Sequence, residues 1–319
     1  MPTILRPALS CPALLLLCAC LLLPGCRQDE APAAATSDAA AKPAQAVRQL
    51  TAHLRTNDLE AFARDAVPPA LHAQLETAWH EGRTRWPLDE LPFGRRLPGL
   101  LKSLAAPGSE ARLQQVFDRQ FAGADRQLHG AAASLGLFGA QYLEHEGDYS
   151  GDERQHYAQL IAAASRWGAS APLGDRQRAR AAIAQLAIAA RNTGLTSEAA
   201  FREAGMDASL RRMGTFAAAF KRALARYGLD LDADLGTLDA SLQQQTGDSA
   251  RVRMRYRFGG QDIDTVVSLR RIDGHWYLAD YLRHAQAALA RPPAPAATLA
   301  EPAAAAAPAP PAHSSRVGR

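Results

Sequence analysis

Cysteine is missing from almost the whole chain. All four cysteines lie in the first 26 residues, at Cys11, Cys18, Cys20 and Cys26. The rest of the chain therefore cannot form a disulfide, a cysteine nucleophile or a cysteine-ligated metal site. The sequence also has no HExxH, G-x-S-x-G, P-loop or G-x-G-x-x-G motif. These absences weigh against the common metalloprotease, hydrolase and nucleotide-binding classes.

Long hydrophobic runs are almost as scarce. One continuous apolar run extends from Ala13 to Leu23, about 11 residues, and a membrane-spanning helix needs ~20. The run follows a single early cation, Arg6, and precedes a small residue and Cys26. That layout is typical of a secretory signal. We therefore expect residues 1–25 to be a cleaved signal peptide.

The end of this run, Leu23-Pro24-Gly25-Cys26, resembles the lipobox of bacterial lipoproteins. A leucine lies three positions before the cysteine and a glycine directly before it, although Pro24 replaces the usual small or aliphatic residue. The resemblance implies that Cys26 becomes the first residue and carries the acyl chains. Because Arg27 rather than aspartate follows, it also implies an outer-membrane anchor facing the periplasm. The alternative is a plain cleaved signal that leaves Cys26 as a free thiol.

Two segments are rich in alanine and proline and contain few large apolar side chains. Residues 26–45 are expected to be a flexible tether, and residues 291–319 a disordered tail, because neither can bury enough surface to offset its ordering entropy. The net charge of +4 is too small to indicate a nucleic-acid partner. The residues between the two segments are enough for a real core.

Residues 46–228 show the apolar spacing of helices. Asn57-Asp58 is a predicted N-cap, and Gly228 is a predicted helix stop. Representative apolar stripes are Leu71, Leu75 and Trp79; Leu113, Val116, Phe117 and Phe121; and Leu210, Met213, Phe216, Phe220 and Leu224. No apolar stripe is long enough, and free enough of charged residues, to span a membrane.

After Gly228 the apolar period changes to two, as in strands. Leu238, Ala240 and Leu242 alternate with polar residues, and turns are predicted at residues 246–249, at Gly259-Gly260 and at Asp273-Gly274. Counting outward from the last two turns pairs Tyr256 with Ile263, Val252 with Val267, Leu269 with Leu278 and Arg271 with Trp276. Residues 229–290 are therefore predicted to form a four-stranded antiparallel meander and a short terminal helix, within the same globular unit as the helices. The fold class is α+β, mostly helical.

The alternating arginines of RVRMRYRF, residues 251–258, are interpreted as the solvated face of a strand. On the predicted register Arg255 faces Asp264 and Arg257 faces Asp262, which leaves Arg251 and Arg253 unmatched. The alternative is an anion-binding role for these arginines. Asp280 would fall on the apolar face opposite Val267, and it either forms hydrogen bonds at the strand end or orients a ligand.

The two ends of the globular part, residues 46–71 and 252–282, resemble bacterial lipoproteins with an NTF2-like α+β fold. In that family the last hairpin carries a dG-x-W-x-x-x-D pattern, and Asp273, Gly274, Trp276 and Asp280 stand in those places. The resemblance implies helices packed on a curved sheet and a mostly structural role for these residues. The helical stretch from about 80 to 230 is absent from the small members of the family.

Two segments carry the remaining candidates. The acidic residues 144–156 could gather ligands for a divalent metal, but Ser150 and Glu153 fit a capping box and favour a helix start. Trp86 and Phe93, in a proline-punctuated connection, either pack on the core or form the lip of a pocket. With Trp276 and Asp280 they are the candidate ligand-pocket residues. We assign no catalytic, cofactor-binding or metal-ligating residue.

Three functions fit the sequence. The first is a non-catalytic outer-membrane binding or scaffold lipoprotein with an apolar or peptide ligand. The second is a cell-envelope enzyme with a site in the concavity between helices and sheet, near Asp280 and a histidine such as His275 or His284. The third is an interaction module for peptidoglycan or lipopolysaccharide that uses Arg251, Arg253 and arginine-rich helices. The expected partners are the membrane, through Cys26, and a lipid, peptide or envelope polymer.

Overall fold

The computed structural model describes residues 42–91, 94–145 and 148–290. Predictions for the signal peptide, Cys26, the C-terminal tail and Phe93 lie outside these residues, as does most of the predicted tether. The elements in chain order are α2 (Pro43–Thr56), α3 (Leu59–Asp65), α4 (Pro69–His80), η2 (Leu88–Glu90), η3 (Gly94–Arg96), α5 (Leu97–Ala105), α6 (Ser109–Gln120), α7 (Asp125–His145), α8 (Gly151–Gly168), α9 (Arg176–Thr193), α10 (Glu198–Ala204), α11 (Met206–Arg226), α12 (Leu231–Leu235), β1 (Asp239–Thr246), β2 (Ser249–Phe258), β3 (Gln261–Ile272), β4 (His275–Leu278) and α13 (Ala279–Ala290).

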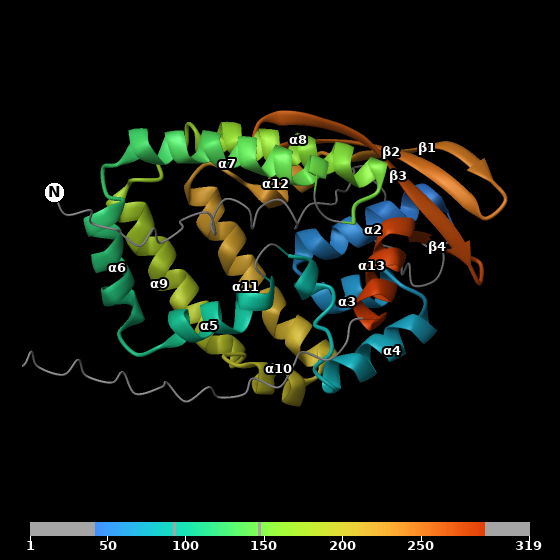
Figure 1. Cartoon of the computed structure of the whole chain (residues 1–319), viewed down its shortest axis with the longest axis horizontal. Coiled ribbons are helices and arrows are strands. Elements are labelled where there is room, and N and C mark those ends of the chain that lie inside the picture. Colours follow the sequence, from blue (N-terminus) through green and yellow to red (C-terminus); the bar gives the residue numbers. More distant parts are fainter. Residues whose placement is uncertain (1–41, 92–93, 146–147, 291–319) are drawn as a thin grey trace, which may run out of the picture.

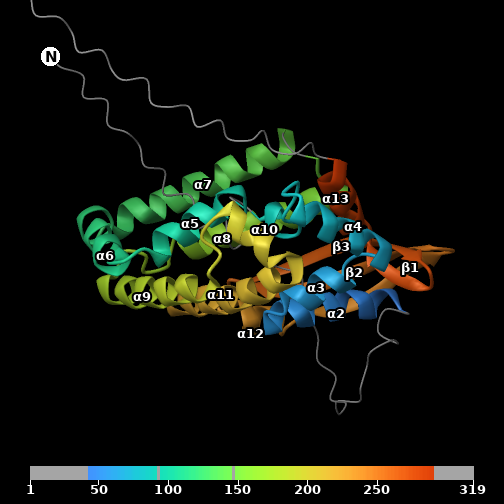
Figure 2. The same ribbon diagram turned by 90° about the horizontal axis from the view of Figure 1, so that it is seen from below.

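The predicted α+β class, with a C-terminal antiparallel meander packed against helices, is confirmed. The sheet has the order β1-β2-β3-β4 and lies at one end of the molecule, whereas α5, α6 and α9 lie at the other (Figure 1). Seen from below, α9 and α11 run side by side and α13 lies next to α4 (Figure 2). One continuous core cluster contains residues from α2, α8, α9, α11, the sheet and α13.

Several helix ends follow their local sequence. Asp58 caps α3 by accepting a hydrogen bond from the Ala61 N–H at 2.9 Å, as predicted. Gly228, with φ of 86°, follows the end of α11, where the left-handed conformation favours glycine. The first helix among the residues described, α2, begins at Pro43, so the predicted tether 26–45 is too long at its C-terminal end. Proline suits a first helical turn, because its missing N–H would have no helical partner there.

The predicted strand register is confirmed at Tyr256–Ile263, Val252–Val267, Leu269–Leu278 and Arg271–Trp276. The inward face of β2 is buried at alternate positions, so the arginine face is the outward one. Leu242 pairs with the buried Val252, so it lies on the same face as Ala240, as the alternation predicts. Its side chain is nevertheless 48% exposed. The register shifts only after it, between Leu242 and Gln244.

Three of the four arginines of β2 form ion pairs, and these differ from those predicted. Arg257 lies opposite Asp262 as predicted, but among the residues described no ion pair joins them. Arg251 pairs with Asp152 of α8 at 3.1 Å, and Arg253 rather than Arg255 pairs with Asp264. Arg255 instead pairs with Asp239 of β1. The prediction that Arg251 and Arg253 lack partners is therefore wrong. Arg255 lies between two carboxylates, Asp239 on β1 and Asp264 on β3, and it pairs with the one on β1. The long Arg253 side chain reaches Asp264 diagonally.

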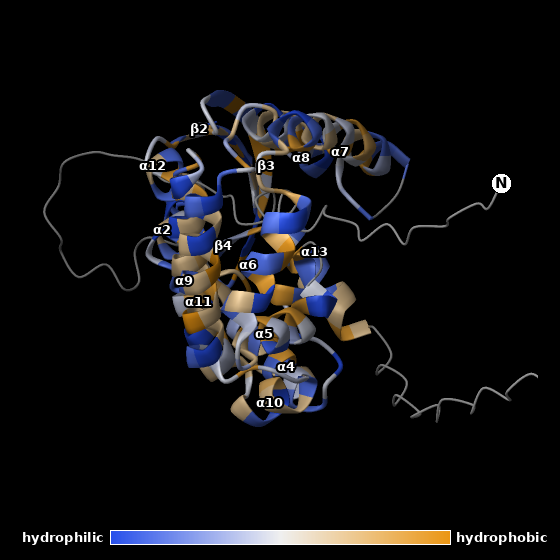
Figure 3. Ribbon diagram, turned by 90° about the vertical axis from the view of Figure 1, so that its left-hand side faces the viewer, coloured by the Kyte–Doolittle hydropathy of each residue, from blue (hydrophilic) through white to orange (hydrophobic). Residues whose placement is uncertain are grey.

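Helix α8 covers a sheet edge that β4 leaves open. β4 pairs only with residues 269–272 of β3, so residues 261–268 have no strand on that side among the residues described. The Gln159 side chain donates to the Asp264 carbonyl at 2.8 Å and accepts from the Asp264 N–H at 2.9 Å. One amide thus satisfies both backbone groups of an edge residue, as a neighbouring strand would. Seen end-on, α8 lies between the sheet and α7 (Figure 3).

Within the described parts of the chain, none of the helices combines the length and the apolar character needed to cross a bilayer.

Because β2 has one buried and one exposed face, substitutions at neighbouring residues should lower the free energy of unfolding by different amounts. Tyr256 is 4% exposed, so Tyr256→Ala should lower the free energy of unfolding by ~3 kcal/mol or more. Arg255 has a 54% exposed side chain, so Arg255→Ala should cost less than about 1 kcal/mol. Denaturant titration of both variants checks this. Equal costs would contradict the assigned faces.

Candidate functional site

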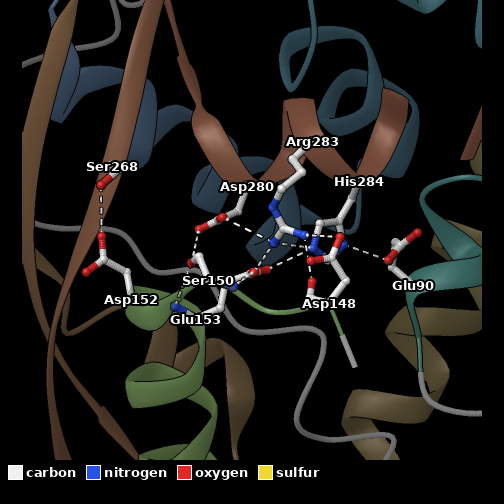
Figure 4. A network of polar contacts seen from close by, with 9 residues as sticks. All are labelled: Glu90, Asp148, Ser150, Asp152, Glu153, Ser268, Asp280, Arg283 and His284. Atoms are coloured by element: carbon white, nitrogen blue, oxygen red, sulfur yellow. Dashed lines mark hydrogen bonds and ion pairs between the residues drawn. The ribbon is translucent and has the colours of Figure 1, made fainter. Parts of the chain in front are cut away.

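A network of charged side chains joins the start of α8 to α13, and we call it the ionic clasp (Figure 4). It links four elements and the loop that precedes α8. Its members are Glu90, Asp148, Ser150, Asp152, Glu153, Ser268, Asp280, Arg283 and His284.

The clasp begins with the capping box of α8, which is confirmed. The Ser150 hydroxyl accepts from the Glu153 N–H at 3.1 Å, and the Glu153 carboxylate accepts from the Ser150 N–H at 2.9 Å. This reciprocal pair satisfies two backbone donors at the helix start. The side chains of Asp152 and Glu153 therefore take up fixed positions in the first turn of α8.

Asp280 lies in a helix rather than at the end of a strand, which corrects the sequence prediction. β4 ends at Leu278 and α13 begins at Ala279, so Asp280 does not lie opposite Val267. The residues Asp280, Arg283 and His284 have the i, i+3, i+4 spacing of one helix face. The Ser150 hydroxyl donates to Asp280 at 3.1 Å.

The cations of α13 converge on the Glu153 carboxylate. Arg283 forms an ion pair with Glu153 and also reaches Asp280 at 3.3 Å and Asp148 at 3.0 Å. His284 lies 3.1 Å from Glu153 through Nε2 and 2.7 Å from Glu90 through Nδ1. Arg283 Nη2 also lies 3.0 Å from His284 Nε2, because both cationic groups share one carboxylate.

The protonation states follow from these contacts. Burial disfavours the charged form of His284, but its hydrogen bonds to Glu153 and Glu90 outweigh burial and raise its pKa to about 9. Burial also opposes ionisation of Glu153, but the hydrogen bonds from His284 and Ser150 and the nearby Arg283 charge lower its pKa. Burial and the neighbouring Glu153 charge raise the pKa of Asp280. At neutral pH the centre of the clasp is therefore an imidazolium between two carboxylates.

This arrangement suits a structural role better than catalysis. A general base needs a free lone pair near neutral pH, and both nitrogens of His284 instead donate to carboxylates. The same engagement leaves no imidazole lone pair for a metal ion. His275, the other candidate histidine, is exposed and bonds the Asp273 carbonyl at 3.0 Å, so it is not part of the clasp.

A second buried contact involves His156, which lies about one turn after Glu153 on α8. His156 Nε2 lies 2.6 Å from the Tyr256 hydroxyl, and burial lowers the pKa of His156 to about 4. A neutral imidazole can accept the tyrosine hydrogen bond without placing a charge in the core. His156 is 4% exposed, so the pair is closed to solvent and anchors α8 to β2.

The candidate pocket residues do not line an opening together. Trp86 is 1% and Trp276 is 2% exposed, so both belong to the core, and the Arg271 guanidinium lies 5.7 Å from the Trp276 ring centroid. Asp280 belongs to the clasp, and Phe93 lies outside the described residues. Of the two alternatives for Trp86, packing on the core or forming the lip of a pocket, the structure shows packing on the core.

The sequence did not point to Glu90 or Arg283, it offered His156 only as a possible metal ligand within residues 144–156, and it placed Asp280 in the wrong element. The helical spacing of Asp280, Arg283 and His284 was a usable signal. No local pattern connected Glu90 of η2 with His284, because 194 residues separate them.

An exposed apolar surface lies on α7, which we call the α7 face and define as Leu137, Phe138 and Tyr142. These side chains are 64%, 66% and 57% exposed. The opposite side of the helix packs closely on α8, where a Cβ at Gly136 would lie 2.5 Å from the Ser165 Cβ. Glycine there allows the two helices to approach. Helix α7 is thus apolar on both sides, and one side has no neighbour among the residues described.

The clasp predicts that stability falls as the pH rises. His284 keeps its proton in the folded protein up to about pH 9, whereas its ordinary pKa is 6.5. Between these values the folded state binds more protons, so the free energy of unfolding should fall by on the order of 3 kcal/mol. His284→Gln should remove this part of the decline, measured by denaturant titration across that range.

His275→Gln is the matched control for this experiment, because His275 is exposed and lies outside the clasp. It should keep the full decline of the unfolding free energy. If His284→Gln keeps it as well, His284 does not hold its proton as described.

No protein-family model matches the chain, and neither a curated protein nor a solved structure does. The resemblances to lipoproteins and to the NTF2-like fold therefore stay predictions from the sequence.

Proposed function

We propose that the protein is a non-catalytic binding or scaffold lipoprotein, anchored to the outer membrane through Cys26 and facing the periplasm. Its α7 face binds an apolar or amphipathic peptide segment of a partner protein. The lipobox-like Leu23-Pro24-Gly25-Cys26 supports the location. The α7 face supports the binding activity.

The clustering of exposed apolar side chains carries the proposal. The large apolar side chains that are exposed among the described residues are Leu100, Leu137, Phe138, Tyr142, Ile188 and Leu242. Half of them belong to one stretch of α7, while the others are single residues on α5, α9 and β1. Isolated exposed apolar residues are ordinary, whereas grouped ones indicate an interaction surface.

The composition of α7 favours a peptide over a lipid surface. Helices that lie in a membrane interface carry many Lys and Arg residues beside the apolar face, but the one basic side chain of this kind in α7 is Arg126. Small exposed residues, Ala131, Ala133 and Ser134, lie beside the α7 face. Small residues next to large ones allow a second helix to pack its ridges closely.

The two alternatives have weaker support. An envelope enzyme using His284 would need a free imidazole, and both nitrogens are engaged. An envelope-polymer module would need free cations on β2, but Arg251 and Arg253 are paired with Asp152 and Asp264. The α7 face, by contrast, exposes large apolar side chains that a partner could bury.

The anchor is tested by Cys26→Ala. Without the acyl chains, the protein should move from the outer-membrane fraction to the soluble periplasm, because no other lipid attachment is proposed. Fractionation of cells expressing each form, followed by immunoblotting, measures this. A variant that stays with the outer membrane would rule out the lipid anchor.

The binding surface is tested by a photo-crosslinking amino acid placed at Phe138 in cells. Ile188 is the matched control, since it is a large apolar residue with 53% exposure on a different helix, α9. We expect a discrete protein adduct from position 138 and none from 188, with the crosslinked peptide mapped by mass spectrometry. Substituting Leu137 and Tyr142 by Ser should abolish the adduct.

Other outcomes contradict the proposal. Adducts to lipid or lipopolysaccharide alone would mean that the α7 face contacts the membrane. Equal adducts from both positions, or adducts that survive the serine substitutions, would mean that the face has no specific partner.

A further inference from the structure

Three potential metal ligands meet where α4 packs against the start of α11. His72 and Glu76 are one turn apart on α4, and Asp207 lies in the first turn of α11. Taking one ligand atom from each residue, the three atoms lie within 4.8 Å of one another. The cluster is separate from both the ionic clasp and the α7 face.

These side chains approach one another without forming hydrogen bonds. His72 Nδ1 lies 3.8 Å from Glu76 Oε1, and His72 Nε2 lies 3.9 Å from Asp207 Oδ1. Both distances exceed hydrogen-bond length. By comparison, His53 Nε2 lies 2.8 Å from Asp65 Oδ2, which is within hydrogen-bond distance.

The cluster also contains buried atoms that have no partner. His72 is 9% exposed, and its Nε2 and Asp207 Oδ1 are buried without any hydrogen-bond partner. Arg211 lies one turn after Asp207 but donates to Glu60 at 2.8 Å. A buried polar atom without a partner destabilises the fold. A bound ligand would give these atoms a partner.

The ligand atoms are near the spacing that one ion requires. Donor atoms bound at about 2.0–2.2 Å to the same metal ion lie about 3 to 4 Å apart, and one imidazole nitrogen and one oxygen from each carboxylate lie within 4.8 Å of one another. An imidazole binds an ion through one nitrogen, so the carboxylates must move towards that nitrogen when the ion binds. Glu76 and Asp207 have side chains that are 41% and 39% exposed. Their carboxylates can therefore rotate onto an ion, and water can complete its coordination.

Hydrogen bonds to one carbonyl hold the two helices of the cluster in place. The Trp79 indole N–H of α4 donates to the Phe201 carbonyl of α10 at 2.9 Å, and the Ser209 hydroxyl of α11 donates to the same carbonyl at 3.3 Å. The start of α11 is thereby held against α4 through α10. The distance between His72 and Asp207 is consequently set by the fold rather than by flexible loops.

We propose that His72, Glu76 and Asp207 form a binding site for a divalent transition-metal ion, with zinc as the ion that suits them best. One imidazole nitrogen and two carboxylate oxygens match the ligand preferences of zinc. Mg²⁺ and Ca²⁺ prefer oxygen ligands alone. A bound ion would tie α4 to the start of α11 and would satisfy the buried atoms.

The test is a zinc titration of the full chain purified in detergent, followed by calorimetry and by the rise in unfolding temperature. We expect one saturable equivalent of zinc and a stabilised fold. Asp207→Asn and Glu76→Gln should each weaken binding at least about 10-fold and His72→Ala about 100-fold or more, since even outer-shell changes have effects of 10–100-fold. His275→Gln, which removes an exposed histidine elsewhere, should leave binding unchanged.

Cobalt provides a readout that stability alone does not affect. Bound Co²⁺ should show visible absorption bands that zinc abolishes and that excess Mg²⁺ does not. Absence of saturable zinc binding, or equal binding by the wild type, Asp207→Asn and Glu76→Gln, would overturn the proposal. Those two variants change half-exposed side chains, so they decide the question even if His72→Ala does not fold.

Discussion

The open edge of β3 is the constraint from which much of the structure follows. Strand β4 is short, so the first part of β3 presents backbone groups that need partners. Helix α8 supplies them through the Gln159 amide, and His156 adds a buried hydrogen bond to Tyr256 of β2. These contacts fix both the position and the rotation of α8 against the sheet.

Once α8 is fixed, its first turn decides where the C-terminal helix lies. The capping box holds Glu153 at the start of α8, and its carboxylate receives Arg283 and His284 from α13. Burying such a cluster costs desolvation energy, which several good contacts offset. We interpret the clasp as a device that positions α13 and η2 relative to α8, because every charged group at its centre has an opposite charge within contact distance.

The surfaces that we propose to be functional lie away from this clasp. The α7 face is apolar and exposed on the far side of the helix that packs on α8. The His72, Glu76 and Asp207 cluster contains polar atoms that lack partners. The charged groups at the centre of the clasp pair with one another. The other two places leave apolar side chains exposed or buried polar atoms without partners, and such groups are where ligands bind. The two proposals rest on different residues, and each can fail without the other.

The sequence by itself determined the features that depend on neighbouring residues. The alternation in RVRMRYRF and the Gly-containing turns specified the sheet register, and Ser150 with Glu153 specified a helix start, because backbone geometry and capping act within a few residues. Only the tertiary structure decided that Asp280 begins a helix, that Trp86 and Trp276 are buried, and that Arg253 pairs with Asp264. It alone brought Glu90 to His284 and His72 to Asp207. Such contacts depend on how distant elements pack, and no short-range pattern records that.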